Sequence, residues 1–234
     1  TITANGDVTN TRAVRKIGDS SIIFDGTGDY LTIPDSTDWD FGDNDFTIEF
    51  WMNTDVISAD GSIGLITKGH NGSHFAWGVF RVTDTVKLYA SNSANDAWEF
   101  TEEMVTGLSA GTWYHIAIVR NGDDYTGYKD GVVDQTFTNS HTLIETSLGV
   151  SIGLQYTGYD FEGYLDEIRI SNTARYTSGF TPSTTEFTAD ANTKLLIHSN
   201  WTGGLGADSS GNYNNFTPTN LVATDQMVDS PTNN

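Results

Sequence analysis

The chain has 234 residues, with 31 acidic and 11 basic side chains, a formal net charge of -20 and no cysteine. This charge argues against nucleic-acid backbones and anionic membranes as partners, since both need a positive contact surface, and the lack of cysteine excludes disulfides and thiolate metal sites. No apolar run approaches the roughly 18 residues of a membrane span, so we expect no membrane insertion, and no signal peptide is visible at the start.

The predicted elements are short strands. Apolar and polar residues alternate in runs that end at glycine, Asn-Gly or Asp-Gly, whereas no window of about ten residues has helical spacing. In chain order the runs cover residues 20–24, 30–33, 46–52, 64–68, 77–82, 87–90, 113–120, 125–129, 132–137, 150–154 and 163–170. Many short strands at this spacing predict an all-β sandwich or barrel.

A three-stranded meander is predicted between residues 113 and 137. Asn121-Gly122 follows its first run, and Asp130-Gly131 joins the second to the third. Both dipeptides readily adopt the positive φ angles that tight hairpin turns require. Residues 171–190, rich in Thr, Ser and Pro, are predicted to form a long surface connection, and a further strand follows at 193–198.

The run at 163–170 places an acid in a predicted strand. Alternation puts Tyr164, Asp166 and Ile168 on one face, and Leu165 and Glu167 on the other. If the isoleucine face is the buried one, the Asp166 carboxylate needs a cation or several hydrogen bonds. Burying it unpaired would cost several kcal/mol or protonate it.

A series of motifs carries a family resemblance. In order they are Ser21-Ile-Ile-Phe-Asp-Gly-Thr-Gly-Asp-Tyr-Leu-Thr-Ile-Pro34, Phe46-Thr-Ile-Glu-Phe-Trp51, Gly111-Thr-Trp-Tyr-His-Ile-Ala-Ile-Val-Arg120, Tyr128-Lys-Asp-Gly131 and Gly163-Tyr-Leu-Asp-Glu-Ile-Arg-Ile170. Over residues 18–172 the chain resembles the laminin-G-like modules of the concanavalin A-like lectin/glucanase superfamily. The resemblance implies a jelly roll, a two-sheet antiparallel β-sandwich with curved sheets.

The resemblance also bears on domain organisation. Such modules begin with a strand followed by Asp-Ser-Ser-Gly-Asn, and here that motif comes late, at residues 208–212. The strand at 193–199 therefore either completes this sandwich or opens a following repeat. We favour completion, because an orphan strand would expose its apolar side chains. The predicted domain covers residues 1–200, with its core at 18–172, and residues 201–234 form a polar tail or the start of a repeat.

Calcium is the cofactor that the resemblance implies. Relatives often hold an ion where the Phe-Asp-Gly turn meets the final Asp-Glu strand, and the matching residues are Asp25, Asp29 and Asp166, with carbonyls of the turn up to Gly28. Hard oxygen donors around a glycine turn suit calcium. The alternative is that Asp25 and Asp29 only cap turn amides, while Asp166 accepts backbone N–H bonds.

Glycans are the second candidate ligand. Trp77, Trp98, Tyr156 and Tyr159 lie in or beside polar loops, where an aromatic ring could stack on a sugar. The alternative is that these rings fill the core of the sandwich. Glycoside hydrolysis is not expected, because it needs carboxylates that share one face. Asp166 and Glu167 are adjacent and point to opposite faces, and Glu102-Glu103 is predicted to lie in a loop.

A second resemblance concerns the biological setting. The segments Arg175-Tyr-Thr-Ser-Gly-Phe-Thr-Pro182 and Asp229-Ser-Pro-Thr-Asn-Asn234, with the Asp-Ser-Ser-Gly-Asn signal, are similar to parts of marine bacteriophage virion proteins. This implies a non-catalytic attachment module on the virion surface or outside the cell, whose partners are other virion subunits and host cell-surface polysaccharide. A carbohydrate-binding domain of a secreted microbial adhesin or polysaccharidase, and a spacer without a ligand, stay as alternatives.

Overall fold

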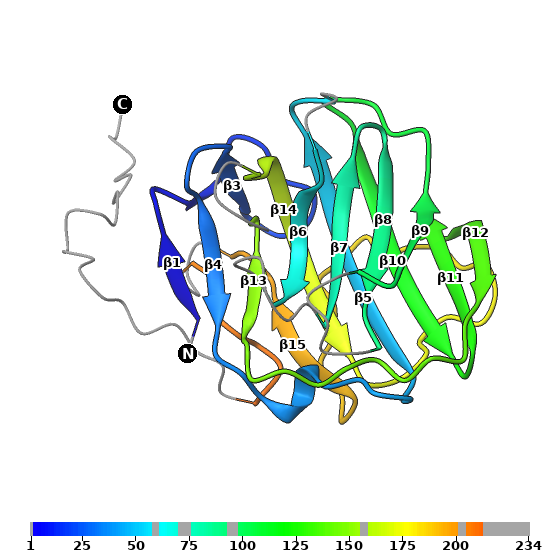
Figure 1. Cartoon of the computed structure of the whole chain (residues 1–234). Helices are drawn as coiled ribbons and strands as arrows, with labels where there is room; N and C mark the ends of the chain where they lie inside the picture. Colours follow the sequence, from blue (N-terminus) through cyan, green and yellow to red (C-terminus); the bar gives the residue numbers. More distant parts are fainter. Residues whose placement is uncertain are drawn as a thin grey trace, which may run out of the picture.

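The computed structural model describes residues 2–57, 61–69, 76–92, 98–154, 159–200 and 205–212. Two antiparallel sheets lie face to face, as Figure 1 shows. The prediction of an all-β, two-sheet sandwich is confirmed. A single turn of 3-10 helix, η1 (Thr37–Trp39), interrupts the strands. No helix in the described part of the chain has the length and apolar character needed to cross a membrane.

The first sheet has seven strands. Their spatial order is β1 (Thr3–Asn5), β4 (Tyr30–Ile33), β13 (Val150–Ile152), β6 (Ile63–Lys68), β7 (Trp77–Val82), β8 (Thr85–Ala90) and β9 (Phe100–Val105). β1 and β9 were not predicted, because β1 is very short and β9 carries two adjacent acids. Glu102 and Glu103 therefore lie in a strand, and the prediction of a loop there is wrong.

The second sheet has eight strands. Seven of them follow the order β12 (Val132–Thr138), β11 (Asp124–Lys129), β10 (Trp113–Asn121), β5 (Phe46–Thr54), β14 (Glu162–Ser171), β3 (Ser21–Asp25) and β2 (Thr9–Thr11), and β15 (Thr193–Ile197) pairs with β14. The predicted meander is confirmed, with β10 paired to β11 and β11 to β12. The fold places sequence-distant strands side by side, since β14 lies between β5 and β3.

The core fills the space between the sheets. Phe46, Ile48 and Phe50 point into it from β5, two residues apart as alternation requires, and each is fully buried. Leu195 and Ile197 reach the same core from β15. β15 pairs in antiparallel fashion with the second half of β14, where Ile197 faces Ile168. The Asp-Ser-Ser-Gly-Asn motif at residues 208–212 packs beside β15, since its Asp208 side chain accepts a hydrogen bond from the Leu196 amide at 3.1 Å.

A bulge in β14 changes which residues face the core. Its pairing with β5 shifts between Asp166 and Arg169, and Glu167 has a φ of 49°. Leu165 therefore points into the core before the bulge, and Ile168 does so after it. The prediction that Asp166 shares a face with Ile168 is wrong, because the extra residue breaks the two-residue period. Asp166 lies on the outer face of the sheet.

Residues 172–192, which we call the cover segment, cross the outer face of the eight-stranded sheet. The ring of Tyr176 stacks on Phe180 with 3.5 Å between centroids, and Phe180 packs against Tyr128 of β11. Glu49 lies beneath this segment and is fully buried. Arg169 contacts it at 2.7 Å, and the Tyr176 hydroxyl donates to it at 2.8 Å. The segment is thus part of the packed structure as well as a surface connection.

Candidate functional site

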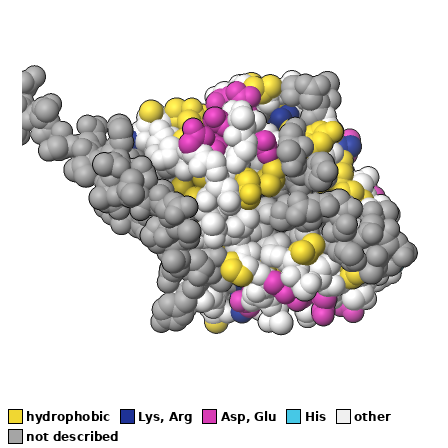
Figure 2. All heavy atoms as spheres, turned by 60° about the vertical axis from the view of Figure 1, so that its left-hand side comes forward, with side chains coloured by type: hydrophobic (Ala, Val, Ile, Leu, Met, Phe, Trp, Pro, Cys, Tyr) yellow, Lys and Arg dark blue, Asp and Glu magenta, His cyan; other side chains and the backbone are white. Residues whose placement is uncertain are grey.

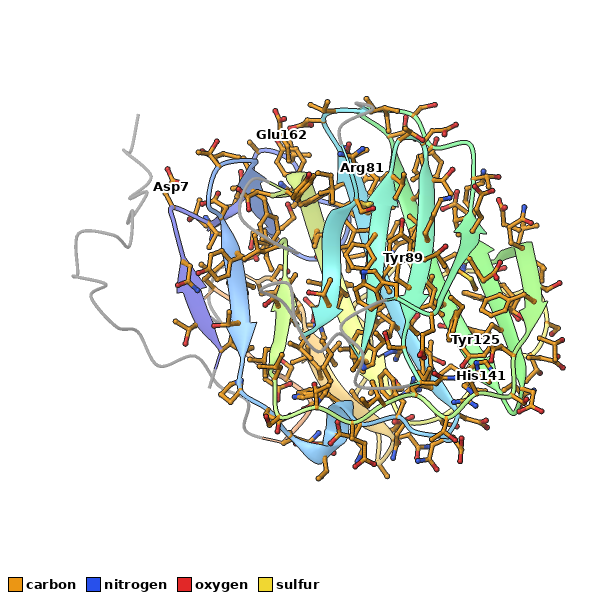
Figure 3. All side chains as sticks on the ribbon, viewed as in Figure 1. Asp7, Arg81, Tyr89, Tyr125, His141 and Glu162 are labelled. Carbon is orange, nitrogen blue, oxygen red and sulfur yellow. The ribbon has the colours of Figure 1, made fainter. Side chains whose placement is uncertain are left out.

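One end of the sandwich gathers acidic side chains. Asp25 ends β3, Asp29 precedes β4, and Asp7 lies in the turn between β1 and β2. A carboxylate oxygen of each lies within 4.8 Å of those of the other two. Figure 3 labels Asp7 beyond the end of β1, and Figure 2, which brings that side forward, shows acidic side chains gathered on the surface. We call Asp7, Asp25 and Asp29 the acidic turn cluster.

Asp29 is the buried member of the cluster. Its two carboxylate oxygens accept backbone N–H bonds from Asp7 at 2.8 Å and from Asp25 at 3.0 Å. Burial raises the pKa of Asp29 to about 6, and the neighbouring Asp25 charge adds to this, although the backbone N–H bonds act in the opposite direction. A cation at this site would favour the ionised form of Asp29.

Glycines allow the turn between β1 and β2 to approach the turn between β3 and β4. Gly6 has a φ of 72°, and a Cβ atom there would lie 2.5 Å from both Asp29 Oδ1 and the Gly28 carbonyl oxygen. Gly28 has a φ of 78°, and its amide donates to Asp160 Oδ2 at 3.0 Å. Asp160 Oδ1 is buried and has no hydrogen-bond partner among the described residues. Backbone and carboxylate oxygens thus converge on this turn.

Asp166 does not belong to the acidic turn cluster. Asp25 pairs with Glu162, four residues before Asp166, and at roughly 3.3 Å per residue this separates their backbones by about 13 Å. Asp166 Oδ2 instead accepts the amides of Lys16 and Ile17, at 3.0 and 2.9 Å. The structure brings Asp25 and Asp29 together as expected and adds Asp7. The signal for Asp7 was Gly6-Asp7, a glycine followed by an acid.

The aromatic residues singled out in the sequence divide into three cases. Trp77 is 1% exposed, and its indole N–H donates to the Trp39 carbonyl at 2.9 Å, so it fills the core and its assignment to a ligand surface is wrong. Tyr156 lies outside the described residues. Tyr159 is 40% exposed and rests on Gly61, where a Cβ would lie 2.2 Å from its ring.

Trp98 and Tyr159 lie near a third aromatic residue that sequence reasoning missed. Tyr89 points outward from β8, because Leu88 and Ala90 on either side of it face the core. Its ring centroid is 5.7 Å from that of Trp98, and its hydroxyl is 3.0 Å from the Ser62 hydroxyl, next to Gly61. We call Tyr89, Trp98 and Tyr159 the aromatic surface. Figure 3 labels Tyr89 in the part of the seven-stranded sheet that β7 and β8 form.

A comparison with protein families matches residues 25–178, which is more than half of the chain. The family model is described as the concanavalin A-like lectin/glucanases superfamily. The chain belongs to this superfamily. The expected resemblance is thereby confirmed, and it accounts for the two-sheet jelly roll. No curated protein sequence matches the chain.

Solved structures of the same fold include domains that bind carbohydrate. Domain 4 of the extracellular arabinanase AbnA from Geobacillus stearothermophilus, in complex with arabinotriose, is 17% identical with a TM-score of 0.57, over 74% of this chain and 82% of that one. The binding domain of Paraclostridial Mosquitocidal Protein 1 is 15% identical with a TM-score of 0.61, over 75% and 45%.

A third neighbour is botulinum neurotoxin type C, whose cell entry depends on interaction with two ganglioside molecules. It is 12% identical with a TM-score of 0.56, over 75% of this chain and 44% of that one. The chain spans less than half the length of the mosquitocidal and neurotoxin chains that it matches. At these identities the similarity establishes the fold, and the ligands named belong to those proteins.

Proposed function

We propose that this chain is a non-catalytic glycan-binding module and that the aromatic surface contacts the sugar. The observation that carries the proposal is the group formed by Tyr89, which points outward from β8, by Trp98 beside it and by Tyr159, which contacts Gly61 next to the Ser62 hydroxyl. Aromatic rings stack on the apolar faces of sugars, and hydroxyl groups beside them give the sugar hydrogen-bond partners. The arabinotriose and ganglioside ligands of structural neighbours support the same ligand class.

The acids of β14 are unsuited to glycoside hydrolysis. Asp166 and Glu167 are both fully buried. The Asp166 carboxylate is held by two backbone amides, and Glu167 Oε1 lies 2.9 Å from His198 Nδ1. Hydrolysis needs two carboxyl groups that flank a bound glycosidic bond, and these two have no access to a substrate. This supports binding without catalysis.

Glycan binding is tested on an array with the variants Tyr89→Ala and Trp98→Ala. Loss of a stacking ring is worth roughly 0.5–1.5 kcal/mol beyond its buried area, so we expect each variant to bind the selected glycan at least several-fold more weakly. The matched control is Trp113→Ala, which removes a half-buried aromatic ring from the opposite sheet. Equal binding by Trp98→Ala, Tyr89→Ala and the wild type would contradict the assignment of this surface.

We also propose that the acidic turn cluster binds calcium as a structural ion. Three carboxylates within 4.8 Å of one another repel unless a cation or protons neutralise them, and oxygen donors with flexible geometry suit calcium. Calcium should raise the melting temperature and a chelator should lower it. Asp7→Asn should lose this response, whereas the exposed Asp43→Asn should keep it. A chelator-insensitive melting curve for the wild type would exclude a stabilising ion.

The pKa of Asp29 predicts how this calcium binding depends on pH. Because its folded-state pKa is raised to about 6 from an ordinary 3.8, protons compete with calcium below about pH 6. We expect the calcium-induced rise in melting temperature to be full above pH 6 and to shrink as the pH falls toward 4. Melting curves with and without a fixed calcium concentration measure this rise at each pH. A rise that does not change with pH would contradict the role given to Asp29.

For the biological setting we propose attachment of a bacteriophage virion to host cell-surface polysaccharide, alongside other virion subunits. The support is the sequence resemblance of residues 175–182 and 229–234 to virion proteins. A carbohydrate-binding domain of a secreted microbial adhesin or polysaccharidase is the alternative. Neighbouring genes or flanking sequence of virion type would favour the first, and an attached catalytic domain or signal peptide would favour the second.

A further inference from the structure

β12 is an edge strand at one end of the eight-stranded sheet. It pairs with β11 on one side, and none of the described strands pairs with its other side. Figure 1 shows β12 at the right-hand end of the sandwich. Beyond the pairing with β11, residues 132–138 make no backbone–backbone hydrogen bond within the described ranges. Because backbone groups in an antiparallel strand point alternately to both sides, about half of those in β12 face away from β11.

The side chains of β12 do not protect this edge against pairing. Val132 is 67% exposed and Val133 is 43% exposed. Edge strands are commonly blunted by lysine, by proline or by a covering segment, and β12 has neither lysine nor proline. The cover segment reaches the residue before β12, where the Phe180 amide donates to the Gly131 carbonyl at 2.8 Å, and it leaves both valines exposed.

A bulge divides the edge into two parts. The register of β12 on β11 shifts between Val133 and Gln135, so Asp134 has no partner residue across the strands. Residues 135–138 follow in regular register and include threonine and phenylalanine, which favour strands. A docked strand would therefore pair with residues 135–138 and lay further side chains beside the two exposed valines.

Acidic side chains lie at both ends of β12. At one end, Asp124 is the partner of Thr138 across the strands, and Asp123 precedes it. At the other end, Asp130 lies in the turn that leads from β11 into β12. Asp123, Asp124 and Asp130 are all exposed. We call these three residues the edge acids.

The neighbouring lysine does not compensate the edge acids. Lys129 Nζ donates to the Thr106 carbonyl at 2.6 Å and lies 3.6 Å from Asp134 Oδ2, so its charge is directed to the bulge. None of the edge acids forms an ion pair with a base in the described part of the chain. Exposed charges act over about 8 Å at physiological salt, so basic side chains at the ends of a docked strand would be attracted.

The same charges disfavour a second copy of this chain as the occupant. In a two-fold antiparallel pairing of β12 with itself, the start of each strand lies beside the end of the other. Asp130 of one copy would then lie at the same end as Asp123 and Asp124 of the other. Each copy also carries a formal net charge of -20. Like charges across paired strands are destabilising, so the edge favours a different, basic chain.

We infer that β12 binds an extended segment of a partner protein, which adds a strand to the eight-stranded sheet. The segment has β-branched residues at its centre and lysine or arginine at both ends. Backbone hydrogen bonds supply affinity, and contacts with Val132 and Val133 select the side chains. Because Tyr89 of the aromatic surface belongs to the other sheet and the two sites share no residue, this inference is independent of the proposed function.

The experiment titrates the whole chain with the synthetic peptide Lys-Lys-Val-Thr-Val-Thr-Val-Lys-Lys, followed by NMR and hydrogen exchange. We expect saturable binding that slows exchange of the β12 amides that face away from β11, and that weakens as salt is added. Two matched peptides separate the causes. One has glutamate in place of lysine, and the other has glycine at the five central positions. Each should bind about tenfold more weakly or worse, because the first loses the charge and the second the strand propensity.

A double variant tests the edge acids. Asp123→Asn/Asp130→Asn removes one acid from each end of β12 and should weaken binding of the lysine peptide by about threefold or more. It should still fold, because asparagine can accept the His115 amide that Asp130 Oδ1 accepts at 2.9 Å. The matched control, Asp55→Asn/Glu162→Gln, removes two exposed acids beside β5 and β14 and should bind like the wild type.

Four results would overturn the inference. The lysine peptide may leave the exchange of every β12 amide unchanged. The glycine peptide may bind as tightly as the valine peptide, which would reduce the effect to diffuse charge. The double variant may bind as tightly as its matched control. Finally, sedimentation of the free chain may show a dimer whose β12 amides are already protected, which would make a second copy the occupant.

Discussion

At the residue scale, Asp166 shows how burial and hydrogen bonding compete. Its side chain is fully buried, Oδ2 accepts two backbone amides, and Oδ1 has no hydrogen-bond partner among the described residues. Burial raises the pKa of Asp166 to about 7, because the two amides offset only part of the cost of desolvating the charge. The carboxyl group ties the loop around Lys16 and Ile17 to the outer face of β14.

This pKa predicts a pH dependence of stability. Because the folded-state pKa of about 7 lies above the ordinary 3.8, the folded protein binds the proton more tightly than the unfolded chain. The contribution of Asp166 to the unfolding free energy is therefore highest below pH 4 and is lost as the pH rises toward 7. In Asp166→Asn this contribution should disappear, since the amide oxygen can still accept the two N–H bonds and no charge is buried.

Urea unfolding of the wild type and Asp166→Asn at several pH values between 4 and 8 measures the difference. Acids that do not interact with Asp166 contribute equally to both proteins, so the difference between the two curves reports Asp166 together with its coupled neighbours Glu167 and His198. The unfolding free energy of the variant, relative to the wild type, should increase across this range. A constant difference would mean that Asp166 is ionised in the folded protein throughout.

At the element scale, the cover segment is held by a buried charge pair. Burial raises the pKa of Glu49, but His115, Arg169 and Tyr176 outweigh it, so its pKa is lowered and the carboxylate stays charged. Arg169 Nε donates to Glu49 Oε1 at 2.8 Å, and the guanidinium also lies 4.2 Å from the Phe187 ring of the cover segment. Glu49 therefore joins strands β5 and β14 to residues 172–192.

Replacing Glu49 should weaken the attachment of the cover segment and lower the unfolding free energy of the whole domain. In Glu49→Gln the Arg169 charge loses its buried partner, and removing one member of such a pair costs about 3–5 kcal/mol. Urea unfolding measures the loss, and hydrogen exchange should show faster exchange of amides in residues 172–192. The control is Glu103→Gln, whose exposed pair with Lys87 at 3.1 Å should contribute at most about 1 kcal/mol. Equal stability of both variants would refute the role given to Glu49.

At the scale of the whole molecule, the sandwich depends on pairing between strands that are distant in sequence. β15 begins after the cover segment, yet it pairs with β14 and supplies the fully buried Leu195 and Ile197 to the core. Each such side chain contributes roughly 1.5–3 kcal/mol on burial. The chain must therefore complete the cover segment before its last strand can join the sheet.

Truncation tests whether residues 193–199 belong to this domain. A chain ending at residue 192 should lose several kcal/mol, a large part of the ~5–15 kcal/mol typical of a whole domain, because it lacks both core residues and exposes half an edge of β14. A chain ending at residue 212 keeps β15 and the Asp208 contact, and should melt at a higher temperature than the chain that ends at residue 192. Circular dichroism melting curves compare them, and equal melting temperatures would assign β15 to a dispensable tail.

The sequence alone determined the fold class, the meander between residues 113 and 137 and the superfamily, because alternation and Asn-Gly or Asp-Gly turns are local signals. It also singled out Asp25 and Asp29, which lie within one short turn. Tertiary structure decided that Asp7 joins them and that Asp166 does not. It likewise placed Trp77 in the core and Tyr89 on the surface, although both residues lie in strands.

The reason is that side-chain direction depends on register, and register depends on partners far away in the chain. One extra residue at Glu167 reverses the alternation of β14, and no local pattern marks it, because the bulge accommodates pairing with β5 on one side and with β3 and β15 on the other. Composition and the two-residue alternation therefore determine which segments form strands. Packing between distant strands decides which side chains meet at a site.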